Sequence, residues 1–188
     1  MFRIVTRHII VIALLVIAGA TSGYSQIAAP SPVESPPSLS ETVRQTTLKT
    51  VNGKSFKLSD FSNQVVLINI WATWCGTCRL EMPHLSRLYK QYKSQGVVLL
   101  GLAVTYNEQN DINRVRHYLK QRRIKYKSIW DDGTFSAALV EAVHGRQVIP
   151  QTFVLGKDGR IVRHFSGFNP EFTPPLQRAA VEEALKRR

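Results

Sequence analysis

The stretch that decides the fold is Val65-Val66-Leu67-Ile68-Asn69-Ile70-Trp71-Ala72-Thr73-Trp74-Cys75-Gly76-Thr77-Cys78. Its first eight residues are nearly all apolar and rich in β-branched side chains, which is typical of a strand buried on both faces. The only two cysteines of the chain follow, two residues apart. This spacing permits a small, reducible disulfide. If a helix begins there, free backbone N–H groups and the positive end of the helix dipole favour the thiolate of the first sulfur.

Apolar patterns on both sides of this stretch predict strands that alternate with helices. Residues 47–51 and 55–58 flank Asn52-Gly53, which favours a β-hairpin. After the cysteines, apolar residues recur at helical spacing until Gly96, a C-terminal stop signal, and 97–104 predicts a second buried strand. Further predicted elements are a helix over 111–122, a strand around 129–130, a helix over 135–143, strands over 152–155 and 161–165 joined by an Asp-Gly turn, and a helix over 175–188.

This order of elements predicts a single α/β domain with short appendages. The chain has 188 residues, of which 44% are hydrophobic and 20% charged, a composition that can bury a core. Helices interleaved with buried strands indicate a central sheet between helical layers. In such sheets a reactive group stands at the carboxyl end of a strand, which is where the cysteine pair lies.

The N-terminal region reads as a targeting leader followed by a spacer. Residues 1–8 carry two arginines and no acid, and 9–20 is an unbroken run of apolar and small residues. That run is short for a bilayer span and fits the core of a signal peptide. We therefore assign 1–25 to a signal peptide or N-terminal membrane anchor, 26–45 to a Pro/Ser-rich linker and 46–188 to the folded domain.

The chain is strongly basic, with a formal net charge of +12. Such charge favours anionic lipid headgroups or acidic partners, whereas the simpler interpretation is a solvated helix face. Nucleic acid is not expected as the partner of an exported protein. The densest basic run consists of Lys120, Arg122, Arg123, Lys125 and Lys127.

A reactive role explains the cysteine pair better than a structural one. Export places the chain where disulfides persist, but a bridge over two intervening residues constrains the unfolded chain little. A zinc site would need two further ligands, and no two histidines stand at ligand spacing. The histidines considered were His84, His117, His144 and His164.

Two separated motifs carry a family resemblance. Residues 69–83, Asn-Ile-Trp-Ala-Thr-Trp-Cys-Gly-Thr-Cys-Arg-Leu-Glu-Met-Pro, resemble the active-site segment of thioredoxin-like proteins, and Ile149-Pro150-Gln151-Thr152-Phe153 resembles their cis-proline loop. More narrowly, the chain is similar to TlpA/ResA-like extracytoplasmic thiol-disulfide oxidoreductases. The resemblance implies a thioredoxin-like three-layer sandwich with a central mixed sheet, an N-terminal β-hairpin and an inserted α/β element.

The site residues follow from this resemblance together with local chemistry. Cys75, at the helix start, is the expected nucleophile, and Cys78, one turn further in, suits a resolving thiol. Glu81 shares a helix face with Cys78 and, as in ResA-like members, is expected to move protons and tune thiol acidity, the alternative being a surface glutamate. Asn69 stands where thioredoxins proper have a buried aspartate.

The expected substrate-binding residues are Trp74, Ile149 and Pro150. In the family, the cis bond before the proline lets the backbone of the preceding residue pair with a substrate strand. Pro83 conflicts with a continuous helix, because proline should end or kink it near Met82.

The leading hypothesis is a thiol-disulfide oxidoreductase that reduces disulfides of partner proteins, with cytochrome c maturation or metal-site assembly as the implied setting. It would work in the periplasm or on the outer face of the cytoplasmic membrane, with a separate membrane electron donor and no cofactor besides the Cys75–Cys78 disulfide. Two alternatives stay open: a thiol-based metal or haem-handling chaperone, and a thiol peroxidase. The direction of electron flow is not fixed by the Gly-Thr pair between the cysteines.

Overall fold

The computed structural model describes residues 37–104 and 111–187. The predicted leader 1–25 and residues 26–36 of the predicted linker lie outside this part. The centre of the fold is a mixed sheet with strand order β5-β4-β3-β6-β7. Strands β3, β4 and β5 run parallel, whereas β6 and β7 add on antiparallel at the other side of β3. The strands are β3 (Val65–Trp71), β4 (Val97–Val104), β5 (Lys127–Asp131), β6 (Gln151–Leu155) and β7 (Ile161–Ser166).

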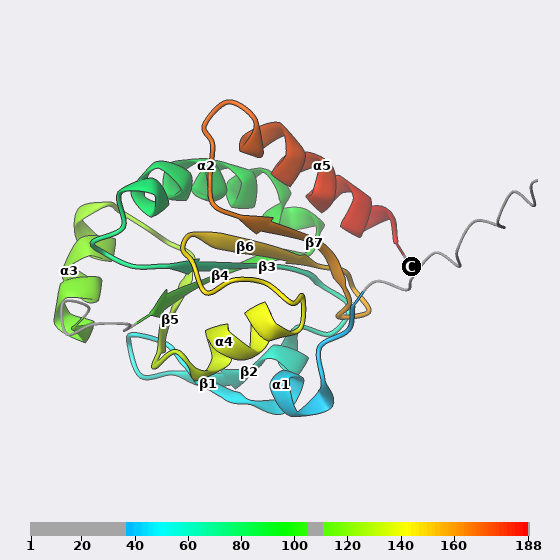
Figure 1. Cartoon of the computed structure of the whole chain (residues 1–188), viewed down its shortest axis with the longest axis horizontal. Helices are drawn as coiled ribbons and strands as arrows, with labels where there is room; N and C mark the ends of the chain where they lie inside the picture. Colours follow the sequence, from blue (N-terminus) through cyan, green and yellow to red (C-terminus); the bar gives the residue numbers. More distant parts are fainter. Residues whose placement is uncertain (1–36, 105–110, 188) are drawn as a thin grey trace, which may run out of the picture. The chain divides into compact units, whose positions relative to one another are not determined.

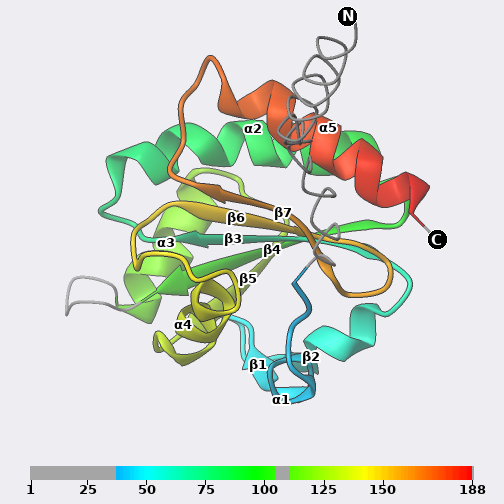
Figure 2. The same cartoon turned by 45° about the vertical axis from the view of Figure 1, so that its right-hand side comes forward.

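Helices cover both faces of this sheet, which confirms the predicted three-layer sandwich. Helices α2 (Gly76–Tyr92) and α5 (Thr173–Lys186) lie together on one face (Figure 1). On the other side lie α4 (Thr134–Glu141), α1 (Glu41–Gln45) and the hairpin of β1 (Thr47–Lys49) and β2 (Ser55–Lys57) (Figure 2). Helix α3 (Ile112–Gln121) connects β4 to the edge strand β5 and forms with it the additional α/β element.

The segment around the cysteines folds largely as its sequence predicts. Every residue of β3 is buried, as expected for a strand covered on both faces. Helix α2 follows and runs into a short 3-10 helix, Lys93–Gln95, that stops at Gly96, whose φ of 87° favours glycine. The helix does not end near Met82 but continues through Pro83 to Tyr92. Pro83 removes only one backbone hydrogen bond, and the buried side chains of Met82 and Leu85 hold the helix through it.

The packed region begins before Thr46. Ser38 forms an isolated bridge with Arg160, the side chain of Leu39 is buried, and Ser40 caps α1 through a hydrogen bond from Val43 N–H to its hydroxyl (3.3 Å). These residues belong to the range 26–45 that composition assigned to the linker. A single apolar side chain that reaches the core, followed by a helix cap, is enough to fix them to the domain.

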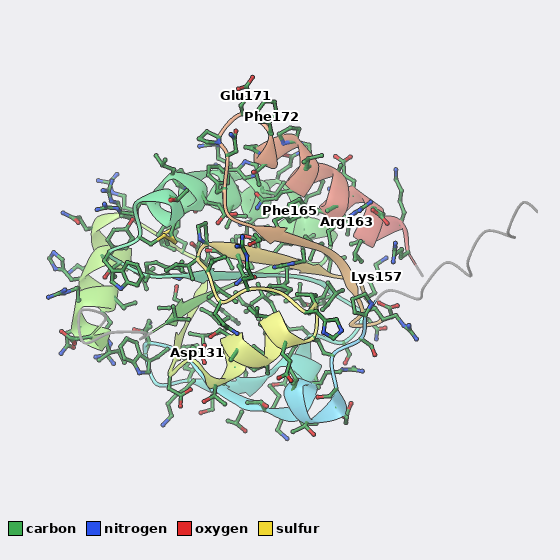
Figure 3. The ribbon with its side chains drawn as sticks, viewed as in Figure 1. Asp131, Lys157, Arg163, Phe165, Glu171 and Phe172 are labelled. Atoms are coloured by element: carbon green, nitrogen blue, oxygen red, sulfur yellow. A yellow bond between two sulfur atoms is a disulfide. The ribbon has the colours of Figure 1, made fainter. Side chains whose placement is uncertain are left out.

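The hairpin and α4 are both attached to the edge strand β5. Val51 N–H donates to Ser128 O (2.9 Å), which joins the end of β1 to that edge. At the carboxyl end of β5, the carboxylate of Asp131 accepts hydrogen bonds from the N–H groups of Phe135 and Ser136 (3.2 and 3.1 Å) and so fixes the start of α4 (Figure 3).

Candidate active site

The cysteine pair lies at the junction between the carboxyl end of β3 and the start of α2. Cys75 is the N-cap of the helix, and its Sγ accepts a hydrogen bond from Cys78 N–H at 3.1 Å. The two sulfurs form a disulfide with an S–S distance of 2.07 Å. Cys75 is 7% exposed and Cys78 is 0% exposed, so of the two cysteines only Cys75 is reached by solvent. In the reduced state the same N–H would stabilise a Cys75 thiolate.

The residues expected at the substrate-binding side are placed at this same end of the sheet. Gln151 at the start of β6 pairs with Ile70 near the end of β3, so Pro150 precedes the strand next to the one that leads to Cys75. The Ile149–Pro150 peptide bond is cis. Pro150 is buried and Ile149 half-buried, whereas Trp74, beside Cys75, is 39% exposed.

Glu81 is fully buried beneath the disulfide helix rather than on the surface. One carboxylate oxygen, Oε2, accepts a hydrogen bond from Asn69 Nδ2 (2.8 Å). The other, Oε1, accepts from Thr152 Oγ1 (2.8 Å) and Gln177 Nε2 (2.6 Å). Three elements besides α2 therefore converge on one carboxyl group: β3, β6 and α5. We call Glu81 and its three donors, Asn69, Thr152 and Gln177, the Glu81 cluster.

The electrostatics of the Glu81 cluster favour a carboxyl group that takes up protons readily. Burial raises the pKa of Glu81 above its ordinary value of 4.5, and the hydrogen bonds from Gln177, Thr152 and Asn69 oppose that rise. All three donors are neutral. No cation of the described residues offsets the cost of burying the charge, and burial outweighs the hydrogen bonds.

Sequence reasoning found Glu81 and Asn69 but missed Thr152 and Gln177. These two donors stand 71 and 96 residues along the chain from Glu81. A signal existed for Gln177, because it shares the buried face of α5 with Ala180, Val181 and Ala184 at spacings of three, four and seven residues. A glutamine on an apolar stripe indicates a buried partner.

The described part of the chain offers neither a metal-binding cluster nor a membrane-spanning helix. Residues 37–104 and 111–187 contain no group of three or more His, Cys, Asp or Glu side chains that could hold a metal ion. Of the histidines considered as zinc ligands, His84 stacks on Phe168 with ring centroids 6.4 Å apart. Within the same described ranges, no helix is both long and apolar enough to cross a bilayer.

The fold and the disulfide together define a class: thioredoxin-like proteins with a Cys-X-X-Cys pair at the start of the helix that follows a central strand. Comparison with known proteins identifies the family. Residues 37–185 match the Redoxin family, to which the chain therefore belongs.

The curated relatives are named for disulfide chemistry. The chain is 32% identical over 117 residues to the thiol-disulfide oxidoreductase ResA of Bacillus thuringiensis subsp. konkukian, a match that covers 62% of this chain and 63% of the relative. It is 27% identical over 167 residues to ResA of Geobacillus thermodenitrificans, with 88% of each chain covered. The chain thus matches less than two thirds of the length of the Bacillus relative.

Solved structures with the same fold come from several bacteria. A thioredoxin-family thiol:disulfide interchange protein from Chlorobium tepidum TLS superposes with a TM-score of 0.67 at 24% identity, covering 80% of this chain and 97% of its own. A secreted thiol-disulfide isomerase from Corynebacterium glutamicum gives a TM-score of 0.61 at 27% identity, covering 73% and 84%. These similarities confirm the thioredoxin-like fold.

Proposed function

We propose that this protein is an extracytoplasmic thiol-disulfide oxidoreductase that reduces disulfides of partner proteins. The observation that carries the proposal is the Cys75–Cys78 disulfide at the start of α2, with Cys75 nearer the surface and its Sγ hydrogen-bonded to the helix backbone. A thiol in that position is acidic and therefore reactive near neutral pH. The similarity to proteins named ResA supports the same activity.

In the proposed reaction, two electrons pass from the dithiol to the substrate. The Cys75 thiolate attacks one sulfur of the substrate disulfide, the substrate S–S bond breaks, and the sulfur that leaves takes up a proton. The Cys78 thiolate then attacks Cys75 Sγ, which closes the Cys75–Cys78 bond and releases the second substrate thiol. A separate dithiol donor in the membrane returns two electrons. No cofactor besides the disulfide takes part.

Glu81 is proposed to accept the proton of Cys78 when that thiol becomes the attacking group. It is buried on the helix face that it shares with Cys78, and burial raises the pKa of its carboxyl group toward the range of a useful proton acceptor. Trp74, Ile149 and Pro150 are proposed to contact the substrate segment, since they lie at the same end of the sheet as Cys75, where β3 ends and β6 begins.

The proposed location is the periplasm or the outer face of the cytoplasmic membrane. The apolar run 9–20 and the Pro/Ser-rich stretch after it support an exported domain on a linker, whether the leader 1–25 is cleaved or retained as an anchor. A relative from Corynebacterium glutamicum is described as secreted. Cytochrome c maturation or metal-site assembly is the setting that we propose for the substrate proteins.

Two measurements test this proposal. Equilibration of the purified protein with glutathione buffers should give a reduction potential nearer to about −270 mV, the thioredoxin value, than to about −120 mV, the DsbA value. In the native host, Cys78→Ala should accumulate a mixed disulfide between Cys75 and its substrate, whereas Cys75→Ala should trap nothing. A potential close to that of DsbA would overturn the assignment as a reductant.

A further inference from the structure

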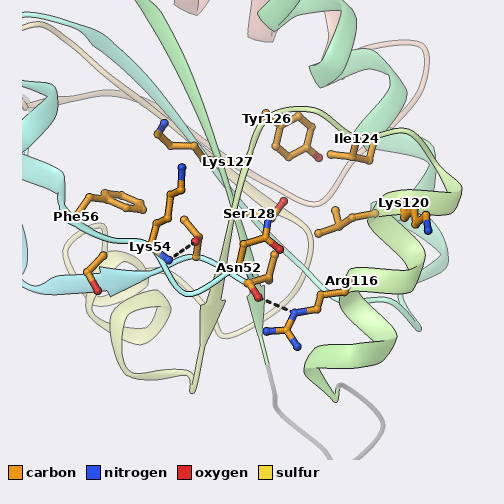
Figure 4. A pocket seen from close by; sticks show the side chains of 13 residues that line it. Asn52, Lys54, Phe56, Arg116, Lys120, Ile124, Tyr126, Lys127 and Ser128 are labelled. Carbon is orange, nitrogen blue, oxygen red and sulfur yellow. Dashed lines mark hydrogen bonds between the residues drawn. The ribbon is translucent and has the colours of Figure 1, made fainter.

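The fold divides the basic run of the sequence between two neighbouring hollows. The larger, with a volume of about 630 Å³, lies between the β1–β2 hairpin, α3 and β5 (Figure 4). The smaller, of about 280 Å³, lies between α2 and the end of α3. Ile124 lines both hollows, so the two adjoin. The cations of the larger hollow are Lys54, Arg116, Lys120 and Lys127, and those of the smaller are Arg79, Arg122 and Arg123.

These seven residues, which we call the basic surface, are exposed. In the part of the chain that the structure describes, no aspartate or glutamate lines either hollow. Among residues 37–104 and 111–187, the ion pairs within 4.0 Å all involve other cations: Arg44, Arg160, Arg163 and Arg187. Seven like charges on adjoining walls repel one another, and no carboxylate of the described residues lies within 4.0 Å of any of them.

The basic surface reaches the redox disulfide through Arg79. This residue directly follows Cys78, and its backbone N–H donates to Cys75 O at 3.2 Å in the first turn of α2. The smaller hollow therefore begins at the helix turn that carries the disulfide. A partner seated on the basic surface would have part of its chain next to the reacting sulfurs.

Stabilisation of the α3 dipole explains only part of this arrangement. Cations at a helix C-terminus are favourable, which accounts for Lys120, Arg122 and Arg123 at the end of α3. Arg116 also lies on α3, where its Nε donates to Val51 O of the hairpin (2.7 Å). The remaining three cations, Arg79, Lys54 and Lys127, come from the first turn of α2, the hairpin and β5. Their convergence on the same two hollows needs another explanation.

We propose that the basic surface docks an acidic segment of the protein whose disulfide is exchanged at Cys75. This inference rests on the proposed function and adds the chemical class of its substrate. Half-buried aromatic side chains between the cations give the hollows a protein-binding character: Phe56 in the larger and Tyr118 in the smaller. The Arg122 guanidinium lies over the Tyr118 ring, 5.7 Å from its centroid. Two concave hollows suit a protruding protein segment better than a flat lipid surface.

The test compares two synthetic peptides of equal length, each with one disulfide, flanked by four aspartates in one and by four lysines in the other. The reduced protein is mixed with each peptide and with uncharged hydroxyethyl disulfide, and the rates are measured. Because electrostatic steering accelerates association by about 10-fold or more, the aspartate peptide should react at least about ten times faster than the lysine peptide at low salt. The ratio should approach one in about 1 M salt, where the Debye length is about 3 Å.

A matched pair of variants separates the basic surface from the overall positive charge. The first replaces Lys120, Arg122, Arg123 and Lys127 by Gln, and it should lower the rate ratio by at least about fivefold. The control replaces four exposed cations outside both linings, Lys90, Lys93, Arg178 and Lys186, by Gln, and should keep most of the ratio. Because both peptides react with the same thiol, a change in thiol reactivity alters both rates equally and leaves their ratio unchanged. If the first variant fails to fold, the salt dependence of the ratio in the unaltered protein still tests the proposal.

The outcomes distinguish the proposed disulfide reduction from the proposed docking of an acidic segment. If hydroxyethyl disulfide is not reduced at all, the proposed function fails. If it is reduced but the peptide ratio is near one, or if both variants lose the ratio equally, the docking surface is wrong. Binding of the unaltered protein and of the first variant to phosphatidylglycerol vesicles is measured as well. If the first variant keeps the peptide ratio but loses vesicle binding, the basic surface is a membrane contact instead.

Discussion

Helix α2 contributes to two regions that handle charge in opposite ways. Glu81 faces the interior, where one carboxyl group meets three neutral donors and, in the part of the chain that the structure describes, no cation. Arg79, two residues earlier, belongs to the exposed basic surface, where seven cations meet no carboxylate of the described residues. In the Glu81 cluster each group is fixed by its hydrogen bonds, so substitutions should change stability and proton uptake. On the basic surface they should change encounter with partners and leave stability nearly unaltered.

The largest expected effect comes from a second acid in the Glu81 cluster. Asn69→Asp replaces a donor, 2.8 Å from Glu81, by a carboxyl group. Two buried carboxyl groups at so short a distance cannot both ionise, so the pKa of one of them rises strongly. The variant should therefore lose about 2–4 kcal/mol of unfolding free energy at neutral pH. Denaturant unfolding of the oxidised protein at pH 7 and at pH 4.5 measures this loss, which should shrink at the lower pH.

Asn113→Asp is the matched control for that change. Asn113 is exposed in the first turn of α3, where a negative charge is favourable, so this variant should be neutral or slightly more stable. Equal losses in the two variants would mean that Asn69 is not specially coupled to Glu81.

The next effect concerns the donor from α5. Gln177→Ala removes the 2.6 Å hydrogen bond to Glu81 Oε1 and leaves a fully buried site underfilled. The expected loss is about 1–3 kcal/mol of unfolding free energy. Gln121→Ala, at an exposed position at the end of α3, should change stability by less than about 0.5 kcal/mol. A loss at Gln177 no greater than at Gln121 would contradict the Glu81 cluster as described.

Glu81 could be predicted as a site residue from the sequence, whereas its contact with Gln177 could not. The strand before Cys75, the helix after it and the Glu81 position follow from local periodicity and spacing, which the chain determines over a few residues. Thr152 and Gln177 reach the same carboxyl group only because β6 pairs with β3 and α5 packs over them. Such contacts depend on tertiary arrangement. For the same reason, the sequence could not show that Lys120 and Lys127 line one hollow whereas Arg122 and Arg123 line another.

A smaller effect is expected in the dependence of stability on pH. Burial raises the pKa of Glu81 above 4.5 in the folded protein, so the folded state holds its proton at pH values where the unfolded state has lost it. The contribution of this group to stability is therefore complete below about pH 4.5 and falls as pH rises toward the folded pKa. The slope cannot exceed about 1.4 kcal/mol per pH unit for one proton.

Glu81→Gln should remove that slope. Unfolding free energies of the oxidised protein between pH 4 and pH 8 would show it, with Glu141→Gln, an exposed glutamate of α4, as the variant that retains the slope. A slope that is the same in Glu81→Gln and in the unaltered protein would show that Glu81 does not titrate as its burial implies.

The smallest effect is expected where the charges are most numerous. Lys54→Gln combined with Lys127→Gln removes two exposed cations from the larger hollow, and neither pairs with a carboxylate among the described residues. Because their neighbours are like charges, the unfolding free energy should stay within about 0.5 kcal/mol of the unaltered value. It should also depend less on added salt, since screening then has less repulsion to relieve. Lys90→Gln combined with Lys93→Gln, at exposed positions outside the linings of both hollows, should leave the salt dependence unchanged. A loss above about 1 kcal/mol in the first pair would mean that these lysines stabilise the fold, and the division between a structural interior and a docking exterior would not hold.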